Sequence, residues 1–419
     1  MKNKFAFTYI FFSILLFCYL LFINFIFYPQ SNFATYKYYY YINFLFLAFG
    51  CTLFFTSDKY NKNVTLTLTS IILGFYFIEA IMIVNNNWKN QDIENYNKFK
   101  IIKKKIETHK NITTPIPLMN IQIDKSKKFT LAGIANTINI HCNENNYYSE
   151  YKSDKFGFNN PNNNVYNNNV DYLITGDSFA HGNCVNENEN IAGNIKKITK
   201  KNTINIGYGG SGPLVQYARL KEYFPETNVK KIIWLFCGEN DIKDLEAELK
   251  NPILIKYLEN DHYTQNLKKL QDNIDYELNK YFFFKLKEYK KKNLFITFIK
   301  LQRIRSYIEY LRIPKNNLDN FKLIMQKAKK FSEDNNSQII FVYLPSYLEV
   351  KSKSLTISSN GLNIIKIIED LEMPIINVYE ELFLNHSDPL SLYPNRNFGH
   401  YNELGYYEVT RTIIAKLQN

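Results

Sequence analysis

The chain has 419 residues, and its 51 Lys and Arg against 39 Asp and Glu give a formal net charge of +12. A basic balance can indicate nucleic-acid binding, but here no nucleic-acid-binding motif accompanies it. Asn, Lys, Ile and Tyr are frequent throughout the chain, which accounts for the charge. We therefore predict no nucleic-acid partner. The length suits a membrane anchor followed by one large or two modest soluble domains.

Hydrophobic residues are concentrated in the first 85 positions. Three apolar stretches lie there, at residues 5–28, 38–57 and 64–84. Each reaches the roughly 20 residues that a helix needs to cross a bilayer. The first stretch is too long for a signal peptide, and the residues after it offer no small-residue cleavage site. These features predict an all-α transmembrane region over residues 1–85.

The distribution of lysines predicts the orientation of these spans. Lys2 and Lys4 precede the first stretch, and Lys59 and Lys62 lie between the second and the third. The positive-inside rule places both pairs in the cytoplasm, and three crossings then put everything after residue 84 outside. The basic cluster at residues 103–105 opposes this, but long translocated domains largely ignore the rule. We expect a multi-pass membrane protein whose soluble domain is extracytoplasmic, either periplasmic or at the cell surface.

Two features near the predicted membrane leave alternatives open. Glu79, in the third stretch, is either a functional group or a carboxylate that lies near the interface or between helices. Residues 281–311 mix aromatic side chains with Lys and Arg. That composition fits a helix on a membrane surface, or a solvated face over a core.

The rest of the chain reads as a soluble α/β domain. Residues 86–121 are polar and predict a partly helical linker, and the domain follows at residues 122–419. Short β-branched runs there alternate with helical patterns, which is typical of a parallel sheet with helices on both faces. A helical insertion, about residues 243–334, separates the third run from the fourth. We predict a flavodoxin-like parallel five-stranded sheet, with strands at residues 170–175, 203–206, 231–237, 338–344 and 374–378.

Chemically useful residues follow these strands. Gly176-Asp177-Ser178 ends the first, Gly238-x-Asn240-Asp241 ends the third, and His400 follows the fifth. The loop after the second strand contains Gly210. The carboxyl ends of parallel strands meet at one edge of the sheet, so these groups are expected to lie together. A serine hydroxyl that acts as a nucleophile needs a base and donors for the oxyanion, and this set provides both.

These motifs, in this order, resemble the conserved blocks of the SGNH (GDSL) hydrolases, and Asn402 and Gly405 after His400 resemble the last block. The resemblance covers roughly residues 154–419. It implies that Ser178 is the nucleophile and that His400 is the base. It also implies that the oxyanion hole comprises the amide of Ser178 together with Gly210 and Asn240. No cofactor and no metal are implied.

One position departs from the family pattern. The family usually has Asp three residues before the His, and this chain has Asn397 there. An amide cannot offset the charge of an imidazolium, and a comparable change in a Ser-His-Asp triad costs about 10⁴ in rate. Either Asp388 in the preceding loop substitutes, or a Ser-His dyad suffices, or the site is weak.

The same motifs allow two plainer interpretations. Gly207-x-Gly209-x-x-Gly212 matches the dinucleotide fingerprint, but the acidic residues after it, Glu222 and Glu226, do not end the next strand. We therefore expect no bound nucleotide. Ser178 could also be a helix N-cap on an inert scaffold. Four motifs in the family's order, each after a predicted strand, make this interpretation less credible.

The cysteines fall into two groups. Cys18 and Cys51 lie in predicted spans, and Cys237 ends a strand. Cys142 and Cys184 lie in polar loops, so they are predicted to form a disulfide if the domain is outside the cytoplasm.

The sequence thus predicts a membrane-anchored serine esterase, acyl hydrolase or O-acyltransferase that works through an acyl-serine. Its partners would be the bilayer and an ester-bearing glycan, lipid or small molecule of the cell envelope, such as an acetylated glycan. The alternative is a catalytically weak or inactive module of the same fold. Such a module would bind glycan or assemble with an envelope protein partner.

Overall fold

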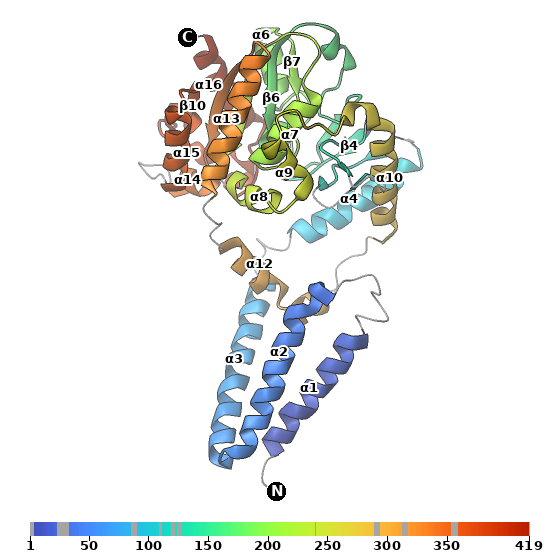
Figure 1. Cartoon of the computed structure of the whole chain (residues 1–419), viewed down its shortest axis with the longest axis vertical. Coiled ribbons are helices and arrows are strands. Elements are labelled where there is room, and N and C mark those ends of the chain that lie inside the picture. Colours follow the sequence, from blue (N-terminus) through green and yellow to red (C-terminus); the bar gives the residue numbers. More distant parts are fainter. Residues whose placement is uncertain are drawn as a thin grey trace. The chain divides into compact units, whose positions relative to one another are not determined.

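The computed structural model describes residues 4–22, 33–84, 90–108, 111–118, 122–123, 128–238, 240–288, 294–311, 317–352 and 359–418. The chain forms two compact units (Figure 1). The first unit comprises Met1–Asn90 and Lys292–Arg312, and the second comprises Gln91–Lys291 and Ile313–Asn419. The chain therefore passes between the two units three times.

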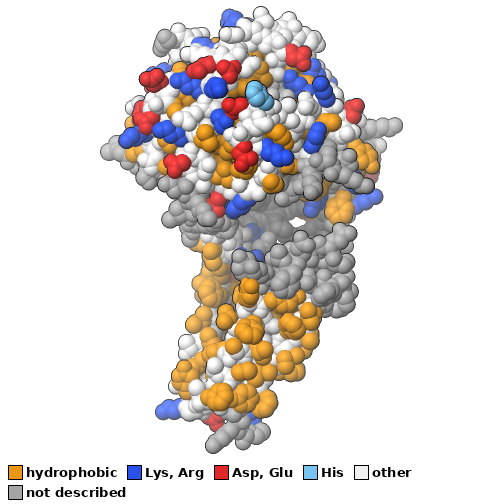
Figure 2. All heavy atoms as spheres, viewed as in Figure 1, with side chains coloured by type: hydrophobic (Ala, Val, Ile, Leu, Met, Phe, Trp, Pro, Cys, Tyr) orange, Lys and Arg blue, Asp and Glu red, His pale blue; other side chains and the backbone are white. Residues whose placement is uncertain are grey.

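The first unit contains three helices from the hydrophobic region: α1 (Lys4–Phe22), α2 (Phe33–Thr52) and α3 (Asp58–Val84). Among the described residues, Lys4–Leu21 and Asp58–Val84 are long and apolar enough to cross a membrane. Tyr39–Phe55 forms a shorter apolar helix. Many large apolar side chains of these helices are exposed, and they appear in orange over this part of the space-filling view (Figure 2). Such a surface is expected where lipid rather than water surrounds a helix.

The second unit is built on a five-stranded sheet whose order is β10-β9-β8-β6-β7, with every pairing parallel. In chain order this is the flavodoxin-like arrangement, so the predicted fold class is confirmed. The strands coincide closely with the predicted runs and are β6 (Val170–Gly176), β7 (Thr203–Asn205), β8 (Val229–Cys237), β9 (Gln338–Leu344) and β10 (Ile375–Asn377). Most of their residues are buried, as strands covered on both faces should be.

Helices cover both faces of this sheet because the connections between parallel strands are right-handed. The connection from β6 to β7 runs toward one edge and carries α6 (Ile191–Thr199). The connections through α7 (Pro213–Tyr223), α13 (Leu318–Asp334) and α15 (Ser359–Asp370) run toward the other edge, so these helices lie on the opposite face. The last helix, α16 (Glu403–Gln418), packs on α6.

Two parts of the chain differ from the simplest interpretation of the sequence. The predicted linker contains α4 (Asn90–Ile106) and β1 (Ile112–Thr113), and β1 pairs with β4 (Ile138–Ile140) in a small sheet completed by β5 (Glu150–Lys152). The predicted insertion is divided between the units. Its helices α8 (Asp241–Glu248), α9 (Pro252–Glu259), α10 (Gln271–Glu288) and α13 lie in the second unit, whereas α11 (Leu294–Ile299) and α12 (Gln302–Leu311) lie in the first.

Candidate active site

Ser178 stands at the turn where β6 passes into the short helix α5 (Ser178–His181). Asp177, rather than Ser178, caps this helix, since its Oδ1 accepts the N–H of Phe179 at 2.9 Å. The hydroxyl of Ser178 is therefore not needed as a helix cap. It can donate to Oδ2 of Asp177, at 3.1 Å, or turn toward another partner.

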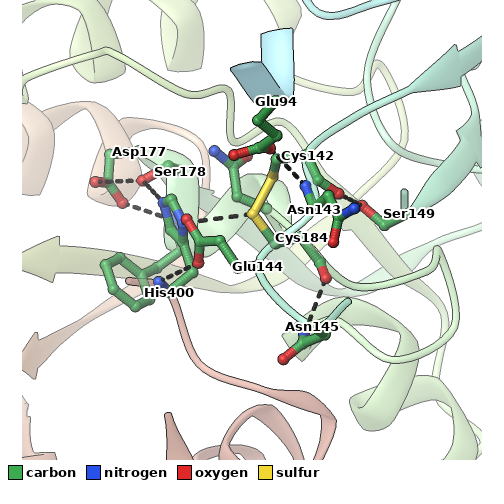
Figure 3. A network of polar contacts seen from close by, with 12 residues as sticks. Glu94, Cys142, Asn143, Glu144, Asn145, Ser149, Asp177, Ser178, Cys184 and His400 are labelled. Atoms are coloured by element: carbon green, nitrogen blue, oxygen red, sulfur yellow. Dashed lines mark hydrogen bonds and ion pairs between the residues drawn. A yellow bond between two sulfur atoms is a disulfide. The ribbon is translucent and has the colours of Figure 1, made fainter. Parts of the chain in front are cut away.

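That partner is His400, which lies in the loop before α16. Its Nε2 is 2.9 Å from Oγ of Ser178, although the two residues are 222 positions apart (Figure 3). The sequence motifs predicted this pairing, and the parallel sheet brings it about by placing both loops at the carboxyl edge. The distance suits transfer of the serine proton to the imidazole.

The other side of the imidazole ring faces Glu144, from the loop between β4 and β5. Its Oε1 lies 3.0 Å from Nδ1 of His400, and its Oε2 accepts the backbone N–H of His400 at 2.7 Å. A carboxylate at Nδ1 keeps the proton on that nitrogen and leaves Nε2 to accept from Ser178. Burial acts to raise the pKa of Glu144. The charge of His400 and the hydrogen bonds from its ring and its amide outweigh burial, so that pKa lies below its usual value.

Glu144 corrects the expectations for the acidic residue. The carboxylate of Asp388 is engaged by Arg396, which donates to both of its oxygens, Nη1 to Oδ1 at 2.8 Å. Asn397, at the family's usual Asp position, is exposed, and its N–H donates to the carbonyl of Pro394. The carboxylate that meets the histidine thus comes from a segment that precedes the first core strand.

Residues 141–149, which we call the acid loop, are held from several sides. The ends of the loop close through backbone hydrogen bonds between His141 and Ser149 and between Ser149 and Cys142. Glu94, in α4, accepts the N–H of Asn143 at 2.8 Å (Figure 3). The predicted linker therefore supports the loop that carries Glu144.

A disulfide joins Cys142 to Cys184, the pair that the sequence predicted. Cys184 lies six residues after Ser178, and its carbonyl accepts a hydrogen bond from Nδ2 of Asn145 at 3.1 Å. The bridge thus links the acid loop to the segment that follows the nucleophile. Glu144, Cys184 and His400 could formally surround a metal ion, with ligand atoms within 4.8 Å of one another. With its sulfur in a disulfide, Cys184 offers no thiolate, so these residues do not fit a metal ion.

The predicted oxyanion donors Gly210 and Asn240 lie in loops whose contacts are as follows. Gly210 has a φ of +71°, which favours glycine, and an added Cβ there would meet no atom within 4 Å. A Cβ at the neighbouring Gly209 would lie 3.6 Å from Cβ of Ser178. Nδ2 of Asn240 donates to Oδ2 of Asp244 at 2.9 Å, and Asn240 also bonds Asp177. The loop of Gly210 therefore comes close to Ser178, and Asn240 contacts the residue that precedes it.

Two buried side chains that the sequence analysis did not single out brace the loop of Gly210. His181 stacks on Tyr208, and its Nδ1 accepts the N–H of Gly209 at 3.3 Å. Burial, with the charges of Arg219 and His400, lowers the pKa of His181 to about 3, so the ring is neutral and can accept this bond. Arg219 donates from Nη1 to the carbonyl of Gly176 at 3.3 Å and to Oγ of Ser211 at 3.2 Å. No local pattern around either residue distinguishes it from an ordinary helix position.

No protein-family model and no curated protein sequence matches the chain. Solved structures do match it. One is a protein assigned to the G-D-S-L lipolytic family from Desulfitobacterium hafniense, with 10% identity, a TM-score of 0.34, and coverage of 58% of this chain and 97% of the other. Another is an acetylxylan esterase from Geobacillus stearothermophilus, with 13% identity, a TM-score of 0.33, and coverage of 60% and 94%. A third is a two-domain esterase active on acetylated mannans, with 12% identity, a TM-score of 0.33, and coverage of 61% and 50%. These three solved structures are thus described as one GDSL-family lipolytic protein and two esterases.

Proposed function

We propose that the second unit is a serine enzyme that takes an acyl group from an ester and carries it on Ser178. The observation that supports this most directly is the continuous line of hydrogen bonds from Ser178 through His400 to Glu144. A serine, a base that it can reach, and a carboxylate that orients the base are the parts that nucleophilic acyl transfer requires.

In the proposed reaction, Nε2 of His400 takes the proton of Ser178 as Oγ attacks the ester carbonyl. The oxyanion is stabilised by the amides of Ser178 and Gly210 and by Nδ2 of Asn240. His400 then gives the proton to the departing alcohol, which leaves an acyl-serine. Water or a second hydroxyl, deprotonated by His400, attacks this ester and restores Ser178, so hydrolysis and acyl transfer use the same residues.

The alternative of a weak or inactive module rests on Asn397, which lacks the usual carboxylate, and on the long helical insertion, which could cover the site or bind a partner. Glu144 supplies a carboxylate at Nδ1 of His400 from another part of the chain. This observation favours an enzyme, because the departure at residue 397 no longer implies an unsupported histidine.

We further propose that the enzyme is anchored in a membrane and faces away from the cytoplasm. The long apolar helices α1 and α3, and the shorter apolar helix Tyr39–Phe55, support three spans. With the lysines of the N-terminus inside, three spans lead the second unit outside. The disulfide between Cys142 and Cys184 suits such a compartment. An enzyme placed there meets the cell envelope, and the substrate we propose is an ester of an envelope molecule such as an acetylated glycan.

The proposal is tested with the full chain in detergent or membranes, using a fluorophosphonate probe and a chromogenic acetyl ester. Ser178→Ala should abolish both labelling and turnover, whereas Ser306→Ala, an exposed serine in the first unit, should change neither. Asn240→Ala should lower turnover by about 10² to 10³, as loss of an oxyanion donor does elsewhere. Labelling and turnover that persist in Ser178→Ala would refute the assignment.

A further inference from the structure

The short helices α11 and α12 belong to the first unit, although the sequence on either side of them builds the second unit. Within the first unit both helices pack on α3 (Figure 1). They occupy the basic and aromatic stretch for which the sequence alone left two interpretations open.

Glu79 holds this pair of helices against α3. Its side chain is fully buried, Oε1 accepts the N–H of Arg303, and Oε2 accepts the N–H of Ile304, each at 2.9 Å. These amides lie in the first turn of α12, where backbone N–H groups have no partner within the helix and a negative charge is favoured. The carboxylate in the third apolar stretch thus connects α3 to α12.

A second contact holds α11. The hydroxyl of Tyr76 donates to the carbonyl of Ile299 at 3.1 Å, and its ring lies 5.1 Å from the ring of Phe298. Tyr76 and Glu79 are three residues apart and lie on one face of α3. One side of the α11–α12 pair is therefore turned to α3.

The pair also carries exposed apolar side chains. Phe295 is 67% exposed and Ile308 is 61% exposed, and Ile299 and Tyr307 are exposed as well. The end of α3 beside it is also exposed and apolar, through Ile81 and Val84. Exposed apolar side chains gathered on helices that pack together indicate a binding partner rather than water.

Charge and position identify the partner. Residues 294–311 contain three basic side chains, Lys300, Arg303 and Arg305, against one acidic side chain, Glu309. Glu79 lies five residues before the end of α3, which is about 8 Å along a helix axis at 1.5 Å per residue. A segment at that height beside a spanning helix lies in the headgroup layer, where apolar side chains enter the acyl region and basic ones meet anionic lipid.

We propose that α11 and α12 form a membrane-surface segment that lies in the anionic headgroup layer and is clamped to α3 by Glu79. The inference rests on the proposed anchorage of α3 in a membrane. It adds that the catalytic unit's own insertion binds lipid, so that the bilayer contacts residues far from the N-terminus in sequence.

The test is photo-cross-linking of the full chain in vesicles of phosphatidylcholine and phosphatidylglycerol. A diazirine amino acid replaces Phe295, Ile308, Phe77 of α3 or Tyr276 of α10, one at a time, and lipid adducts are measured by mass spectrometry. Phe77 and Tyr276 are matched controls, being 68% and 67% exposed in the first and the second unit. We expect adduct yields at 295 and 308 comparable with that at 77 and several-fold above that at 276.

The outcomes separate this inference from the proposed anchorage. Lipid adducts at 77 with none at 295 and 308 would overturn the inference and leave the anchorage standing. Protein adducts at 308 in place of lipid would also overturn it and would indicate a protein partner. An absence of lipid at 77 itself would refute the anchorage, and the inference with it.

Discussion

Both carboxylate oxygens of Glu144 contact His400: Oε1 lies 3.0 Å from the ring nitrogen Nδ1, and Oε2 accepts the backbone N–H at 2.7 Å. The first bond fixes the tautomer of the imidazole, and the second fixes the carboxylate itself. The charge of the carboxylate is also available to offset the imidazolium that would form in the proposed acyl transfer.

Glu144→Gln should therefore lower kcat/KM by about 10⁴, the cost of an Asp-to-Asn change in a comparable triad. Ester hydrolysis by the full chain measures the effect. Asp388→Asn is the matched control and should retain activity, because Asp388 pairs with Arg396. A large loss in Asp388→Asn together with full activity in Glu144→Gln would instead indicate that Asp388 orients His400.

Gly399→Ala should disable the site without unfolding the protein. An added Cβ would lie 2.7 Å from Oε2 of Glu144, closer than real Cβ atoms come. The flexible end of Glu144 can move away, so the cost falls on its bonds to His400 rather than on the fold. We expect a loss of turnover similar in direction to that of Glu144→Gln and a nearly unchanged Tm. Gly74→Ala, where an added Cβ meets nothing within 4 Å, should alter neither.

The disulfide should matter for both stability and activity. Closing a loop of 42 residues stabilises a domain by about 4 kcal/mol in the chain-entropy model, less any strain. Reductant, or Cys142→Ser combined with Cys184→Ser, should lower the Tm and lower turnover as the acid loop loosens. Cys237→Ala, which removes a buried thiol outside the disulfide, should leave the effect of reductant intact.

Thiol mapping in intact membranes tests the same feature independently of activity. Alkylation followed by mass spectrometry should find Cys142 and Cys184 blocked until reductant is added. Finding both residues alkylated without reduction would argue against the bridge and against an extracytoplasmic domain.

His181 should make the catalytic unit labile in acid. Burial, aided by the charges of Arg219 and His400, lowers its pKa from 6.5 to about 3. The unfolded chain then binds a proton that the folded chain does not, so the contribution of His181 is present above pH 6.5 and is lost as the pH falls toward 3. Between these values the loss is about 1.4 kcal/mol per pH unit.

His181→Gln removes this titration, so the difference in unfolding free energy between wild type and variant should shrink as the pH falls. Denaturant unfolding at several pH values measures it, and the exposed His262→Gln is the control. A difference that stays constant from pH 6.5 to pH 4 would contradict a depressed pKa.

Glu79→Leu should detach α12, because it removes both acceptors of the first-turn amides. Trypsin should then cut more rapidly after Arg303 and Arg305 in protein held in vesicles. Glu79→Gln keeps one acceptor oxygen and should show an intermediate rate. Equal cleavage of Glu79→Leu and wild type would show that the clamp does not hold the helix.

The sequence predicted the sheet and the Ser178–His400 pair because both depend on short, strong patterns. Buried parallel strands read as β-branched runs, and the groups that follow them must meet at one edge. Glu144 was missed because it lies 256 residues from His400 and in a loop outside that alternation. One clue was present: the predicted disulfide placed Cys142 beside the segment after Ser178, and Glu144 is two residues from Cys142.

The division of the insertion between two units could not be predicted for a different reason. The basic, amphipathic character of α12 fits a core as well as a membrane surface, and its place depends on a contact with Glu79 across more than 220 residues. Similarly, β1 has two residues and no pattern of its own, so its pairing with β4 exists only in the folded unit.

Because the chain passes between the two units three times, one proteolytic cut does not remove every connection between them. A single cut between α3 and α4 would sever the N-terminal helices from the catalytic unit but would leave α11 and α12 docked on α3 through Glu79 and Tyr76. On the proposed anchorage, the second unit would then remain with the membrane pellet as a non-covalent complex until the contact of α11 and α12 with α3 was also lost.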